Sequence, residues 1–109
     1  MALDINNLLG SMVNAAKTSL QGSAKGLTDV AISAFKTLAQ CLVSIEEMKL
    51  AGTITEEQAN LLIDMQKNAV QTAILAEEGL GLLAAQNAIN SAISVVSSLV
   101  NKALGWNIL

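Results

Sequence analysis

The sequence contains no proline, no histidine and no arginine. Because proline is the strongest helix breaker, its absence favours long uninterrupted helices. Without histidine, the chain lacks the commonest general base and metal ligand. With no arginine, and with six lysines against nine acids, it also lacks the basic surface that nucleic-acid binding needs. We therefore expect an all-α protein that is not an enzyme, holds no metal or cofactor, and binds neither nucleic acid nor a small-molecule substrate.

Charged residues and aromatic rings are also scarce. Charged residues make up 14% of the chain and aromatic residues 2%, whereas apolar residues make up 52%. An average domain has about 25% charged residues. No Gly-rich phosphate loop is present, and adjacent acid pairs such as Glu56-Glu57 point about 100° apart on a helix. The single cysteine, Cys41, lies among apolar residues and is expected to be a small buried side chain, so no catalytic residue is predicted.

A turn signal lies near the middle of the chain. Gly52 follows a long apolar-periodic run and predicts a left-handed helix cap, and Thr55 with Gln58 matches the capping-box pattern. We therefore expect a long antiparallel helical hairpin. It forms a single domain, residues 1–109, with four parts: an arm over 4–50, a turn over 51–55, an arm over 56–104 and an apolar tail over 105–109.

Two glycine pairs allow two different shapes for this hairpin. Gly22 and Gly26 precede the turn by about the same distance as Gly79 and Gly81 follow it. If these glycines are hinges, the hairpin folds over into a four-helix bundle. If they are sites of close helix packing, the arms are two straight rods of about 70 Å.

Apolar stripes run along both arms. In the first arm the stripe repeats with an eleven-residue period from Leu9 to Leu42, which is typical of nearly straight helices. The second arm carries one stripe along Leu62, Met65, Ala69, Ala73, Ala76, Leu80 and Leu83, and another along Ala85, Ile89, Ala92, Val96, Leu99 and Ala103. We expect contacts with further copies at Leu20, Leu27, Ala31, Phe35, Leu38, Leu42, Ala84, Ala85, Ala88, Ile89, Ala92, Val96, Leu99 and Trp106.

The 23 residues from Gly79 to Asn101 carry no charge, and this length would cross a bilayer. Eight of them are serine, asparagine or glutamine, concentrated on one side of the helix. Such side chains oppose burial in lipid unless they pair. We therefore expect this polar side to contact other protein or to line a wet lumen.

The two ends of the expected hairpin differ in polarity. Five acids and two lysines lie between Glu46 and Lys67, around the turn, whereas the chain ends in Trp106-Asn107-Ile108-Leu109. We expect the turn to form the water-facing end and the tail to lie at the opposite, apolar end. The tail either folds back onto its own core, docks onto a neighbouring subunit or lies at a membrane interface.

An isolated hairpin would leave apolar stripes in water, because each of its helices buries only about two or three positions in seven. The sequence is compatible with three ways of burying these apolar stripes. Further copies would give a self-assembling structural protein in an oligomer, tube, ribbon or filament, which is the function we expect. Lipid would give a membrane-inserting pore-forming or lysis protein, and the chain itself would give a small adaptor that binds a partner helix.

The nine residues Leu80–Ala88 resemble a stretch of the bacterial proteins that polymerise into coiled R-body ribbons. This resemblance implies self-assembly and does not extend over the rest of the chain. Residues 1–4 lack the basic and apolar regions of a secretory signal. We therefore expect synthesis in the cytoplasm, with membrane association or release as alternatives.

Overall fold

The computed structural model describes residues 3–20, 29–76 and 81–109, and this part of the chain contains four α-helices and no β-strand. The helices are α1 (Ile5–Ser19), α2 (Asp29–Ala51), α3 (Glu56–Leu75) and α4 (Leu82–Leu104). The prediction of an all-α fold is confirmed. The central hairpin is also present, since α2 and α3 pack together across the turn.

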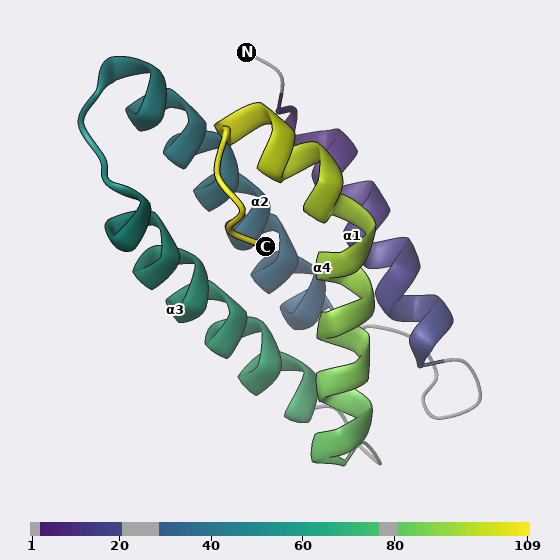
Figure 1. The fold of residues 1–109 in the computed structure, drawn as a ribbon. Helices are drawn as coiled ribbons and strands as arrows, with labels where there is room; N and C mark the ends of the chain where they lie inside the picture. The colour runs from purple at the N-terminus through teal and green to yellow at the C-terminus, as the bar shows by residue number, and fades with distance from the viewer. Residues whose placement is uncertain (1–2, 21–28, 77–80) are drawn as a thin grey trace.

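Each helix runs antiparallel to the next, with α1 and α4 in one layer and α2 and α3 in the other (Figure 1). The molecule measures 43 × 21 × 21 Å. Its length is little more than the roughly 34 Å that the 23 residues of α2 span. Of the two predicted shapes, the structure therefore has the four-helix bundle and not the pair of 70 Å rods.

The expected hinge glycines are only partly described. Gly22, Gly26 and Gly79 lie outside the described residues. Gly81 is the N-cap of α4 and has an extended backbone, with φ −95° and ψ 171°. Because α1 packs on α2, and α3 on α4, each predicted arm doubles back on itself.

The helix ends follow the predicted capping residues. The Thr55 side chain accepts a hydrogen bond from the backbone N–H of Gln58 (3.1 Å), and the Gln58 side chain accepts one from the N–H of Thr55 (2.9 Å). This pair is the predicted capping box. Gly52 has φ +73° and donates its N–H to the carbonyl of Lys49 (3.1 Å), and Gly105 ends α4 with φ +72°. Both glycines hold the left-handed conformation that a C-terminal cap requires.

The apolar stripe of the first arm lies in the core. Its members from Val13 to Leu42 are buried wherever the structure describes them, and Phe35 is fully buried between the layers. The later stripe of the second arm is buried over Ala85–Val96, while its polar side faces outward. For these helices, the periodicity of the sequence identifies the buried side.

α3 buries a different side from the apolar stripe that starts at Leu62. Its buried side chains are Ala59, Ile63, Val70 and Ile74. Of the predicted stripe, Leu80 lies outside the described residues, and the other members are half-buried or exposed: Leu62, Met65, Ala69, Ala73, Ala76 and Leu83. The reason is that α3 carries apolar residues on two sides, and periodicity does not say which side the core uses.

The start of α1 and the end of α4 lie at the same end of the bundle as the central turn (Figure 1). The backbone N–H of Leu3 donates to Oε1 of the buried Glu46 (3.0 Å). The Nζ of Lys49 lies 4.8 Å from the ring centroid of Trp106. The predicted separation of a polar turn from an apolar tail is therefore wrong, because the folded-over chain brings the turn and the tail together.

The tail folds back onto its own bundle. The backbone N–H groups of Ile108 and Leu109 both donate to Oδ1 of Asn101 in α4 (2.9 Å each). The side chain of Ile108 is buried against the core. Of the three predicted fates of the tail, the structure therefore has the intramolecular one.

Candidate interaction surfaces

Most of the residues that were expected to contact further copies lie inside the single chain. Ten of them are buried in its core: Leu20, Ala31, Phe35, Leu38, Leu42, Ala85, Ala88, Ile89, Ala92 and Val96. They pack against other helices of the same molecule, so a second copy cannot reach them while the bundle is folded. The stripe pattern indicates that a side chain is covered, but not whether the same chain or another chain covers it.

The other four residues have different positions. Leu27 lies outside the described residues. Ala84 and Trp106 are half-buried, and Leu99 is exposed on α4. Of the thirteen that the structure describes, these last three are the accessible ones.

Charge is unevenly divided between the two layers of the bundle. The 15 residues of α1 and the 23 residues of α4 contain two charged side chains, Lys17 and Lys102. α2 and α3 contain nine. A typical soluble surface is about 25–35% charged. The layer of α1 and α4 is therefore unusually poor in charge for a surface that meets water.

The α1–α4 face is the outer surface along the seam between α1 and α4. Its residues are Ser11, Asn14, Ala15, Thr18 and Ser19 of α1 and Asn87, Asn90, Ser91, Ser94 and Val95 of α4. Two adjoining hollows of ≈ 720 and ≈ 470 Å³ share Ser19, Ser91 and Val95. No titratable side chain lines either hollow, so the seam offers hydrogen-bonding and apolar contacts but no acid–base chemistry.

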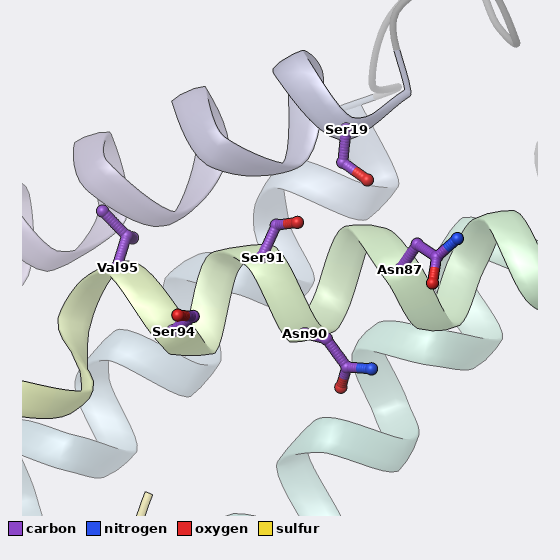
Figure 2. Close-up of a pocket in the computed structure, with 6 residues that line it drawn as sticks. All are labelled: Ser19, Asn87, Asn90, Ser91, Ser94 and Val95. Carbon is purple, nitrogen blue, oxygen red and sulfur yellow. The ribbon is translucent and has the colours of Figure 1, made fainter.

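Figure 2 shows how the larger hollow is built. Ser91 and Val95 point from α4 toward α1, whereas Asn90 points away from α1. Asn90 also lines a smaller hollow with Lys67 and Asn68 of α3. Val95 is 54% exposed in spite of its apolar side chain. Among the described residues, the side chains of Asn90 and Ser91 have no hydrogen-bond partner, so their polar groups are open to a neighbouring molecule.

The α2–α3 face is the outer surface of the other layer. Its residues are Val30, Ala34, Thr37, Cys41, Ser44 and Met48 of α2 and Leu61, Leu62, Met65, Ala69, Thr72 and Ala73 of α3. Val30, Leu61 and Met65 are 66%, 63% and 57% exposed. A groove of ≈ 340 Å³ crosses the turn end of this face, between Met48 and Leu62. No residue of the face is charged.

Cys41 lies half-buried at the middle of the α2–α3 face. Burial raises the pKa of the Cys41 thiol above its usual value, because the apolar surroundings disfavour the thiolate. The side chain is therefore a weak nucleophile in the folded protein. Within the described ranges, no three side chains of the metal-binding types gather into a cluster.

α4 is the described helix that is long and apolar enough to cross a membrane, with a mean hydropathy of 1.3. In the bundle, 39% of this apolar stretch is buried. Core helices of soluble proteins have the same length and composition, so these two properties do not decide between a core helix and a membrane helix.

No family model matches the chain, and no curated protein or solved structure is significantly similar to it. The function of the α1–α4 and α2–α3 faces therefore has to be inferred from the chemistry of their own residues. The sequence predicted the polar side of α4, but it missed the half of the seam that α1 supplies. Ser11, Asn14 and Thr18 recur at steps of three and four residues, and this spacing was the available signal.

Proposed function

We propose that the protein is a non-enzymatic structural protein whose bundles pack side by side into a homo-oligomer. One observation supports this most directly, namely the shortage of charge on the α1–α4 face. Interface centres are depleted of charged residues, whereas surfaces that remain in water retain them. A second copy is a partner whose own face has matching chemistry.

The side chains of the α1–α4 face suit contact with an identical face. Serine and asparagine can each donate and accept hydrogen bonds, so they can pair with the same residues of a second copy. Val95 supplies an exposed apolar group near the shared wall of the two hollows. A self-complementary contact of this kind gives a two-fold symmetric pair of bundles.

The test is the molar mass of the purified full chain, measured by size-exclusion chromatography with light scattering. We expect wild-type protein to run above the 11.3 kDa of the monomer. Val95→Lys places a charge in the contact and should lower the mass. The control is Asn60→Lys, which adds the same charge to an exposed position of α3 outside both faces. Wild-type protein that stays at 11.3 kDa at every concentration would rule out self-assembly.

A membrane-inserting protein is the second candidate, and the apolar length of α4 is the observation that favours it. Insertion would require α4 to leave the bundle and expose the buried side chains of its partners, which opposes it energetically. Dye release from anionic and zwitterionic liposomes distinguishes the two functions. Strong leakage at sub-micromolar protein would favour insertion over assembly.

A further inference from the structure

We infer that the α2–α3 face packs against the same face of a second copy, as a contact separate from the α1–α4 face. This inference rests on the proposed self-assembly and adds the second surface that a polymer needs. A single self-complementary face stops at a dimer. Because the α1–α4 and α2–α3 faces belong to opposite layers, using both would join bundles into an open linear array (Figure 1).

The first argument is that α3 has an apolar side that the described part of the chain covers only in part. Ala59, Ile63, Val70 and Ile74 fill the core. On another side of the helix, Leu62, Met65, Ala69 and Thr72 recur at steps of three and four residues, and Leu61 lies beside them. A spacing of three and four residues is the pattern by which one helix packs along another. α3 therefore carries a packing stripe that the described part of the chain covers only in part, at Leu62, and leaves exposed at Met65, Ala69 and Thr72.

The second argument is that α2 continues the same pattern beside it. Val30, Ala34, Thr37, Cys41, Ser44 and Met48 follow one another at steps of four and three residues. Apart from Val30 and Met48 these side chains are small, so a neighbouring helix can approach closely. The two stripes meet at the groove between Met48 and Leu62. Together they form one two-helix surface without charge.

The third argument is area, which decides between a second copy and a single partner helix. One long side of the bundle measures 43 by 21 Å, about 900 Å². The uncharged α2–α3 face occupies about 27 Å of this length, from Val30 to Met48, so it would form the centre of a contact whose polar rim comes from the rest of that side. A stable interface buries about 800 Å² per partner. A lone helix about 10 Å wide would cover only about half of that width. A second two-helix layer would cover all of it.

The absence of charge also disfavours a lipid surface as the occupant. Helices that lie on membranes carry lysine or arginine around their apolar side and are attracted to anionic lipids. The α2–α3 face has no basic residue, and the chain as a whole has a net charge of −3. An uncharged face of an acidic protein meets least repulsion from an identical uncharged face.

The experiment compares the molar masses of four proteins by light scattering: wild type, Val95→Lys, the double variant Leu61→Lys/Met65→Lys, and all three changes combined. Leu61 and Met65 are mostly exposed, so lysine at both positions should leave the monomer folded. We expect wild type to exceed a dimer, each face variant to stop at a dimer of two 11.3 kDa chains, and the combined variant to be a monomer. Circular dichroism confirms that every variant keeps its helices.

The outcomes separate this inference from the proposed function. If wild type is a monomer, self-assembly is wrong and the inference fails with it. If wild type is oligomeric and Leu61→Lys/Met65→Lys has the same mass, the α2–α3 face is not a contact although self-assembly stands. A drop in mass that Asn60→Lys reproduces would mean that added charge, not the face, is responsible.

Cys41 provides a second readout within the unmodified chain, because it is the only cysteine. In Val95→Lys, which keeps the α2–α3 contact and the native residues around Cys41, N-ethylmaleimide should alkylate Cys41 several-fold more slowly at a protein concentration where light scattering shows the dimer than at one where it shows the monomer. Burial within the monomer and the pKa of the thiol are the same at both concentrations, so they cancel in the comparison. Equal rates would overturn the inference.

Discussion

The Nζ of Lys49 lies 4.8 Å from the ring centroid of Trp106, so a charged residue of the last turn of α2 covers the only tryptophan. A cation over an aromatic ring is attracted by the negative face of the ring. This contact joins the central hairpin to the tail of the chain. It also places a spectroscopic reporter at the end of the bundle where the turn lies.

Lys49→Gln should lower the free energy of unfolding by about 0.5–1 kcal/mol more than Lys102→Gln. Lys102 is the matched control because it occupies the last turn of α4, where it has a similar favourable interaction with the helix dipole. Urea unfolding followed by Trp106 fluorescence measures both variants. Equal losses of unfolding free energy in the two variants would show that the Trp106 ring adds nothing to the interaction of Lys49 with the helix dipole.

Two glycines should respond to alanine in opposite directions. Gly52→Ala forces a side chain onto a backbone with φ +73° and should cost about 1 kcal/mol. Gly10 lies in the interior of α1, and a Cβ added there meets no atom within 4 Å. Gly10→Ala should therefore stabilise the protein by about 0.5–1 kcal/mol. Thermal unfolding by circular dichroism tests the pair, and a shift of the same sign in both would contradict the helix assignments.

Phe35→Ala should destabilise the bundle by about 3–5 kcal/mol, because it removes the largest fully buried side chain from the core. The control is Leu50→Ala, which shortens a side chain that is 72% exposed and lies outside both faces. That change should stay within about 0.5 kcal/mol of wild type. Denaturant titration of both proteins gives the comparison, and similar values would mean that Phe35 is not in the core.

Stability should fall at alkaline pH in part because of Cys41. Burial raises the pKa of this thiol in the folded chain, so on raising the pH the unfolded chain releases the proton first. The contribution of Cys41 is therefore fully present below the unfolded pKa and is lost as the pH rises through the folded pKa. Cys41→Ser should show a shallower alkaline decline than wild type. Parallel curves would show that the thiol is not desolvated.

The sequence predicted the parts of the fold that depend on neighbouring residues. Thr55 with Gln58, and Gly52, act on their own helix ends, so local chemistry was sufficient to place them. The buried side of α1 and α2 also followed from periodicity, since each of these helices has one dominant apolar stripe.

The sequence did not show which apolar stripes are buried inside the bundle and which stay on its surface. Ala88 and Ala92 were expected to be contacts between copies, yet they are buried in the bundle, while Met65, on the other stripe of the second arm, is exposed. Hydrophobic burial is non-directional, so the pattern records that a stripe needs cover and not which element supplies it. Which element covers a stripe depends on whether the two arms fold over. The glycine pairs are compatible both with hinges and with close packing of straight arms, so they did not decide this.

The pairing of the first helix with the last has a consequence for synthesis. α1 packs more extensively on α4 than on α2. During translation α2 and α3 can pair as soon as their short turn has formed, whereas α1 must wait for Leu104 to find its main partner. Until then Leu8 and Met12, which are buried in the finished bundle, have no complete cover. The nascent chain is therefore most exposed to chaperones and premature contacts just before α4 leaves the ribosome.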